Sequence, residues 1–144
     1  MRRVLQIWLV VFGLVCVGIA VAHLFSGTAS IIGGGSVNAT IDSDLRFYAV
    51  LFGAYGLAVA WCARDVERKA VAINLLGAIF FAGGLARSIA WAASGTPNWF
   101  YVLMTPVELV VPVVNYLLVR AVCNESGDRA ARPAAVAVPH PSAS

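Results

Sequence analysis

Charged side chains are scarce in this sequence. They make up 12% of the residues, whereas hydrophobic residues make up 60%; an average soluble domain carries about twice that share of charge. A chain of this composition cannot cover its apolar side chains with polar ones, so it is not an ordinary soluble domain and we expect a lipid bilayer around it. The net charge of +3 does not indicate nucleic-acid binding, because the basic residues lie in short flanks without interleaved aromatic residues.

The sequence also lacks the motifs of the common enzyme classes. It contains no P-loop, no GxSxG, no HExxH and no dinucleotide-binding glycine fingerprint, and it has no repeat of 20–50 residues. Its three cysteines, Cys16, Cys62 and Cys123, lack metal-ligand spacing and are expected to be free thiols. We therefore predict no cofactor and no metal site.

What the sequence does have is four long apolar segments, over residues 4–24, 45–63, 70–93 and 99–122. Each is close to the ~20 residues that a helix needs to cross ~30 Å of hydrocarbon. Helices satisfy their backbone hydrogen bonds within each segment, as a bilayer requires. The predicted fold is all-α, an integral membrane bundle of four transmembrane helices over residues 1–122. Residues 123–144 are rich in Pro, Ala and Ser and predict a disordered tail.

Basic residues lie on one side of the predicted helices. They precede the first helix, separate the second from the third, and follow the fourth: Arg2, Arg3, Arg64, Arg68, Lys69, Arg120, Arg129 and Arg132. The opposite loops hold only Arg46. The positive-inside rule then predicts a multi-pass protein of the inner (plasma) membrane with both termini cytoplasmic.

An alternative applies to the first segment. The stretch "MRR", an apolar run and "AVA" before His23 resembles a signal peptide with a cleavage site. The apolar run is long for a signal peptide, so we favour a retained helix.

Arg87 and Glu108 are charges within the apolar segments. At helical rise Arg87 lies ~9 Å inside the end of its helix, and Glu108 lies ~13 Å inside the start of the next. The short turn "SGTPN" makes these helices antiparallel neighbours, so the two side chains are predicted to pair. An unpaired charge at that depth costs several kcal/mol. The pair is either a structural link between helices, part of a ligand site, or part of a path for ions or protons.

Further polar and aromatic residues gather on the same predicted side of the membrane. The predicted ligand-binding residues are His23, Arg46, Tyr48, Arg87, Trp91 and Glu108. Plainer roles are a hydrogen bond at the interface for His23, a snorkelling cation for Arg46, and packing for Tyr48 and Trp91. The glycine-rich loop of about twenty residues before the second helix is long enough to act as a lid. At its end, Asp42 or Asp44 is expected to cap that helix.

Three stretches resemble one known family: "LRFYAVLFGAYGL", "GAIFFAGGLARSIAW" and "VELVVP". The resemblance is to a bacterial family of small four-helix membrane proteins, domain of unknown function 4345 (DUF4345), and covers about residues 4–121. It rests on Arg46, Phe47, Tyr48, Gly83, Gly84, Arg87, Glu108 and Pro112. It implies a layout similar to the DoxX-like proteins and, more remotely, to sterol-isomerase-type domains. It implies no activity, because the motif of those isomerases is not reproduced.

Two functions compete. The protein binds an amphiphile or lipid in a pocket open to the outer leaflet, or serves as an accessory subunit of a membrane complex. Alternatively, it is an intramembrane enzyme acting on a lipid, quinone or sterol-like substrate, with Glu108 as the acid/base. An enzyme usually has a second titratable group at that depth, and Arg87 stays charged. We favour binding, with membrane lipids, a membrane-protein partner or a second copy as partners. Transport would need dimerisation, because the chain has no internal repeat.

The predicted topology is tested by cysteine accessibility in a variant without the three native cysteines. Single cysteines at Gly34 and Gly95 should react with an impermeant reagent added outside the cell, and one at Glu67 only after the membrane is opened. Labelling of Gly34 from the cytoplasm would contradict the topology.

Overall fold

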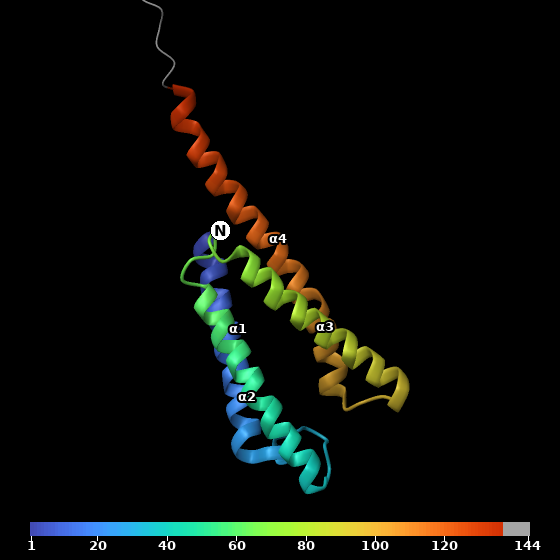
Figure 1. The fold of residues 1–144 in the computed structure, drawn as a ribbon. Coiled ribbons are helices and arrows are strands. Elements are labelled where there is room, and N and C mark those ends of the chain that lie inside the picture. The colour runs from blue at the N-terminus through green and yellow to red at the C-terminus, as the bar shows by residue number, and fades with distance from the viewer. Residues whose placement is uncertain (137–144) are drawn as a thin grey trace, which may run out of the picture.

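A computed structural model describes residues 1–136, and they form an all-α structure without strands. The elements are α1 (Arg2–Ser26), the short 3-10 helix η1 (Gly27–Ser30), α2 (Ala39–Cys62), α3 (Ala70–Ser94) and α4 (Trp99–Val136), shown in Figure 1. All four α-helices are long and apolar enough to cross a membrane. The predicted fold class is confirmed, and the chain is a multi-pass membrane protein.

The start of α2 differs from the prediction. The helix begins at Ala39 rather than near residue 45, and Asn38 is its N-cap, accepting a hydrogen bond of 3.0 Å from the Ile41 backbone N–H. Asp42 lies in the first turn, so the expectation that Asp42 or Asp44 caps the helix is wrong. An asparagine cap satisfies an orphan backbone donor as well as an aspartate does. With η1 in place, the predicted long loop shrinks to residues 31–38.

The end of α4 also differs. The helix continues to Val136 instead of ending near residue 122, so the first part of the predicted disordered tail is helical. Alanine and arginine favour helices, and they are frequent between Arg120 and Arg132. The rest of that predicted tail, residues 137–144, lies outside the described residues.

The helices pair into two hairpins. α1 packs mainly on α2, and α3 packs mainly on α4. The hairpins meet at one end, where the N-terminus and the α2–α3 connection lie, and diverge toward the other (Figure 1). We call these the closed end and the open end. The core lies at the closed end and contains Leu5, Leu9, Val59, Cys62, Ala63, Val66, Ile73, Val119 and Val122.

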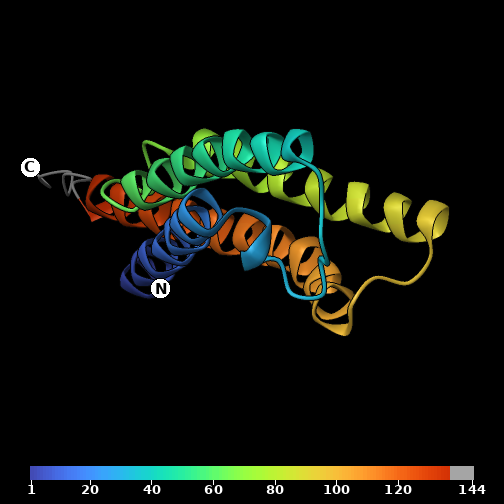
Figure 2. The same ribbon diagram turned by 90° about the horizontal axis from the view of Figure 1, so that it is seen from below.

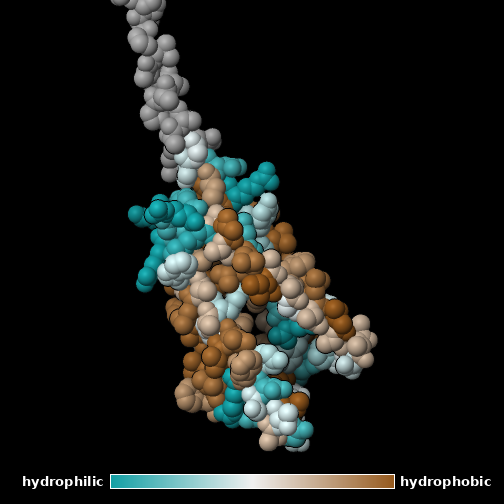
Figure 3. Space-filling view, viewed as in Figure 1, coloured by the Kyte–Doolittle hydropathy of each residue, from teal (hydrophilic) through white to brown (hydrophobic). Residues whose placement is uncertain are grey.

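Polar contacts add to this core at the closed end. Gln6 Nε2 donates to the carbonyl oxygen of Ala63 at 2.9 Å. Glu67, in the α2–α3 connection, lies 3.5 Å from the Arg2 guanidinium and accepts a hydrogen bond from Ser126 of α4. The connection is thereby tied to both α1 and α4. Hydrophilic surface gathers at this end, and brown apolar surface follows it along the helices (Figure 3).

At the open end, a loop reaches between the hairpins. Residues 31–38 pass close to the start of α4 (Figure 2). A Cβ atom added to Gly33 would lie only 2.8 Å from Asn98 Nδ2, so the backbone of the loop lies against the α3–α4 connection. Gly33 has a φ of 75°, which glycine adopts without strain. The loop thus borders the opening between the hairpins.

Two glycines bring α1 and α2 into close contact. A Cβ atom added to Gly13 would lie 2.5 Å from the carbonyl oxygen of Gly56 and 2.9 Å from Ala60. Small residues allow such backbone approach, which supplies the packing that hydrophobicity cannot supply within lipid. Gly18, on the same helix, has nothing within 4 Å of an added Cβ atom.

These glycines give a matched pair of substitutions. Gly13→Ala should destabilise the protein by about 1–3 kcal/mol, because a methyl group overpacks a backbone contact. Gly18→Ala should leave the melting temperature unchanged or slightly raised, since the same helix-propensity gain meets no steric conflict. Thermal unfolding in one detergent compares the two variants. Equal melting temperatures would show that α1 and α2 do not pack through Gly13.

Candidate functional site

The predicted ion pair between α3 and α4 forms. The Nε atom of Arg87 lies 2.8 Å from each carboxylate oxygen of Glu108. The side chain of Glu108 is 13% exposed, and that of Arg87 is 44% exposed. The carboxylate is therefore held between the helices, whereas the guanidinium reaches out from them.

Gly84 allows the two helices to approach at this point. A Cβ atom added to Gly84 would lie 2.9 Å from Leu109 Cδ2 and 3.0 Å from Glu108 Cβ. A larger residue there would push α4 away from α3. The missing side chain is thus what places the Glu108 carboxylate within reach of Arg87, one turn further along α3.

The pair keeps unused hydrogen-bonding capacity. Although Nε is near both oxygens, its single N–H is aligned on Oε1, and the buried Oε2 accepts no hydrogen bond from the described residues. Within residues 1–136, Arg87 makes its only side-chain hydrogen bond through Nε, so Nη1 and Nη2 remain available. The guanidinium carbon lies 5.3 Å from the centre of the Tyr101 ring, a cation–π distance. One acceptor and several donors therefore stay unpaired.

An apolar cleft lies next to this pair. It is narrow, with a volume of about 10 Å³, and all four helices line it through Leu9, Phe12, Tyr55, Val59, Cys62, Ile73, Leu76, Gly77, Phe80, Val111, Pro112 and Asn115. In α4, Pro112 of the cleft is four residues from Glu108, and in α3, Phe80 of the cleft is four residues from Gly84, which packs against Glu108. The ion pair therefore lies about one helical turn, ~6 Å, from these cleft residues in the direction of the open end. The cleft and the pair form one candidate site with an apolar floor and a polar rim.

Two polar side chains at the cleft make hydrogen bonds between helices. Asn115 Oδ1 accepts a hydrogen bond of 2.8 Å from the Trp8 indole N–H. The Tyr55 hydroxyl donates to the carbonyl oxygen of Leu76 at 3.1 Å. These bonds link α1 to α4 and α2 to α3, whereas the Nδ2 group of Asn115 makes no hydrogen bond within the described residues.

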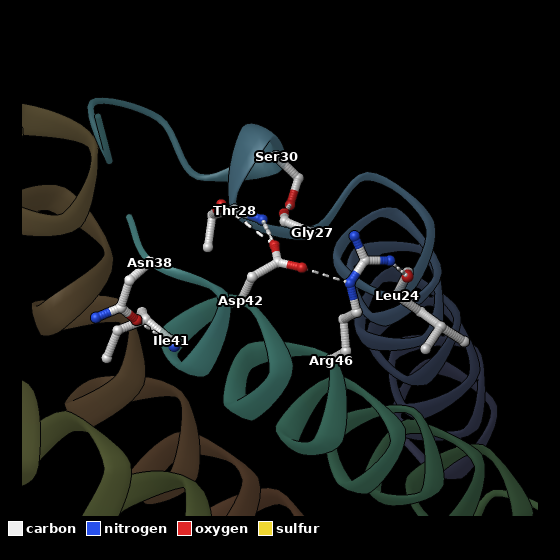
Figure 4. Close-up of polar contacts among 8 residues, drawn as sticks. All are labelled: Leu24, Gly27, Thr28, Ser30, Asn38, Ile41, Asp42 and Arg46. Carbon is white, nitrogen blue, oxygen red and sulfur yellow. Dashed lines mark hydrogen bonds and ion pairs between the residues drawn. The ribbon is translucent and has the colours of Figure 1, made fainter. Parts of the chain in front are cut away.

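A second polar cluster lies where α1, η1 and α2 meet (Figure 4). Arg46 donates from Nε to Asp42 Oδ2 at 2.8 Å and from Nη1 to the carbonyl oxygen of Leu24 at 2.5 Å. The other Asp42 oxygen accepts from the backbone N–H of Thr28 at 2.9 Å. His23 Nδ1 lies 2.6 Å from Ser30 Oγ. These contacts hold η1 on the first hairpin.

The six predicted site residues are divided between the hairpins. His23, Arg46 and Tyr48 belong to α1 and α2, and the other three belong to α3 and α4. No hydrogen bond or ion pair within the described chain joins the two sets. Tyr48 is 62% exposed, and its ring meets that of Phe47. The Trp91 indole donates to Thr96 at 3.2 Å, at the α3–α4 turn.

Two features escaped the sequence analysis, and the sequence carries a signal for only the first of them. Asp42 and Arg46 are four residues apart, the spacing at which opposite charges meet on a helix. Phe12 and Tyr55 line the cleft, but apolar helices show no pattern that distinguishes a cleft wall from a lipid-facing surface. No group of His, Cys, Asp and Glu among the described residues could hold a metal ion.

The ion pair is tested by a double-mutant cycle. Arg87→Met and Glu108→Gln should each lower the melting temperature in detergent, and the double variant should lose less than the sum, with a coupling of about 1–3 kcal/mol. Glu108→Gln should be harsher, because it strands a guanidinium that cannot lose its proton, whereas the carboxyl left by Arg87→Met can bind one. Strict additivity would refute the pair.

Comparison with known proteins gives one match. Searches of curated proteins and of solved structures find no significant match to this chain. The profile of the family described as domain of unknown function (DUF4345) matches residues 4–119. Because that match spans well over half of the sequence and includes both halves of the ion pair, the chain belongs to the DUF4345 family.

Proposed function

We propose that this membrane protein binds an amphiphilic molecule in the cleft between its two hairpins. The observation that carries the proposal is the unused hydrogen-bonding capacity of the Arg87–Glu108 pair, one helical turn from an apolar cleft. Ligand sites commonly combine an apolar wall with a few placed polar groups. The polar head of the ligand would lie at the ion pair and its apolar part along Gly77, Phe80 and Pro112. The hairpins would move apart to admit it, because the cleft has a volume of about 10 Å³ in the structure.

The proposal includes an orientation. With basic residues gathered at the closed end, the positive-inside rule places that end and the N-terminus in the cytoplasm of a cell bounded by a plasma membrane. The open end then faces the outer leaflet. An amphiphile would enter between the hairpins from that leaflet, passing the loop of residues 31–38.

Binding fits the site better than catalysis does. Acid–base chemistry requires a second group that exchanges protons beside Glu108. Among the described residues, the carboxylate of Glu108 forms a hydrogen bond and an ion pair only with the Arg87 guanidinium, which stays charged. His23, the titratable alternative, makes its hydrogen bond with Ser30 on the other hairpin. Partners of the binding protein would be membrane lipids and, as an accessory subunit, a second membrane protein or another copy of this chain.

A pair of glycine substitutions on α3 tests the cleft. Gly77 lies in the cleft wall, where an added Cβ atom would meet Pro112 at an ordinary contact distance of 3.7 Å. Gly77→Leu should fold and should fill the cleft, lowering the fraction of protein that carries a bound amphiphile about tenfold. Gly83→Leu is the control, because nothing lies within 4 Å of a Cβ atom there.

The measurement is native mass spectrometry of protein released from lipid nanodiscs. The wild-type protein and Gly83→Leu should retain a bound amphiphile at equal occupancy, and Gly77→Leu should lose it. Equal occupancy in all three, or no retained molecule in the wild-type protein, would contradict binding in the cleft.

A further inference from the structure

We infer that the α2–α3 connection binds the phosphate of an anionic phospholipid through the side chains of Arg64 and Lys69, beside the ring of Trp61. This surface belongs to the closed end, away from the Arg87–Glu108 pair. The inference goes beyond the proposed function and does not depend on it. Its basis is a pair of basic residues that contact the same carbonyl group at the end of an exposed apolar strip.

Contacts with Trp61 hold the Lys69 ammonium in place. Its Nζ atom lies 3.4 Å from the centre of the Trp61 ring, a cation–π contact, and donates a hydrogen bond of 3.0 Å to the Trp61 carbonyl oxygen. The same oxygen accepts the backbone N–H of Arg64 at 3.3 Å. The two basic residues therefore meet at one carbonyl group, and the ammonium keeps N–H groups for a further acceptor.

The carboxylates of the α2–α3 connection pair with other basic residues. Glu67 lies 3.5 Å from the Arg2 guanidinium, and Asp65 lies 3.9 Å from that of Arg68. Arg64 and the Lys69 ammonium form no ion pair with the described residues. The connection thus carries an excess of positive charge, which attracts an anion.

A strip of exposed apolar side chains on α2 leads to this positive charge. Val50, Leu57 and Trp61 are each more than half exposed, and their spacing places them on one face of the helix. Because α2 crosses a membrane, this face is available to lipid acyl chains. Trp61 lies in the last turn of α2, at the level where tryptophan meets lipid head groups. A lipid whose acyl chain lies along the strip brings its phosphate to Lys69.

The net charge of the head group decides which lipid binds. Phosphate oxygens accept strong, charge-assisted hydrogen bonds from ammonium and guanidinium groups. Basic residues next to a membrane surface each strengthen the attraction to anionic lipids. A choline head group adds a positive charge that cancels the charge of the phosphate and is repelled by Arg64. The site should therefore prefer phosphatidylglycerol to phosphatidylcholine.

Competition between these two lipids tests the inference. The full chain is placed in nanodiscs that contain equal amounts of phosphatidylglycerol and phosphatidylcholine with identical acyl chains, and the lipid retained after release is identified by native mass spectrometry. We expect the wild-type protein to retain phosphatidylglycerol at least about tenfold more often than phosphatidylcholine, as two basic contacts imply.

Two double variants separate a site from the overall charge of the closed end. Arg64→Gln with Lys69→Gln should reduce the ratio of the two lipids to below about threefold. Arg3→Gln with Arg120→Gln removes the same charge at exposed residues that also form no ion pair within the described chain, and it should keep the wild-type ratio. If the first double variant does not fold, Arg64→Gln alone changes one exposed side chain and should lower the ratio about threefold.

Three results would overturn the inference. The first is a ratio below threefold in the wild-type protein. The second is an equal loss of preference in both double variants, which would indicate a diffuse field in place of a site. The third is equal retention of the two lipids while an added hexaglutamate peptide is retained by the wild-type protein alone, which would indicate an acidic protein partner. None of these results bears on binding in the cleft, which the substitutions of Gly77 and Gly83 test separately.

Discussion

The packing at the closed end is the constraint on which the rest of the structure depends. Leu5, Leu9, Val66 and Val122 are almost completely buried there, and Glu67 ties the α2–α3 connection to α1 and α4. Because the core lies at one end, the two hairpins are free to diverge toward the other. That divergence leaves a cleft lined by all four helices. A bundle packed evenly along its length would have filled the same space with side chains.

The two hairpins are held together by different means. In α1–α2, the backbones touch at Gly13 and Gly56. The Asp42–Arg46 pair makes its other hydrogen bonds within the same hairpin, Asp42 with Thr28 and Arg46 with the carbonyl oxygen of Leu24. In α3–α4, a glycine again brings the helices together, but the ion pair beside it satisfies only part of its own donors and acceptors. The two buried side-chain oxygens that accept no hydrogen bond among the described residues, in Asn74 and Glu108, are both on the second hairpin.

The Arg87–Glu108 pair illustrates how a membrane protein tolerates charge. Within lipid, a lone guanidinium or carboxylate costs several kcal/mol, and pairing offsets much of that cost. Complete satisfaction would have required a fork-to-fork arrangement, with two parallel N–H bonds to the two oxygens. Here one N–H faces the carboxylate from the side. The pairing is therefore partial, and Oε2 of Glu108 accepts no hydrogen bond from the described residues.

Composition and segment length alone determined that four helices span a membrane, because a bilayer admits few other structures for such a chain. The spacing across the "SGTPN" turn likewise determined the Arg87–Glu108 pair, since a short turn forces antiparallel neighbours with matched depths. The sequence did not reveal that His23 and Arg46 lie on a different hairpin from that pair, nor that Phe12, Tyr55 and Phe80 enclose a cleft. Only the tertiary structure decided these points. Close packing around small residues determines which faces of uniformly apolar helices meet, and the hydrophobicity of a sequence does not predict that packing.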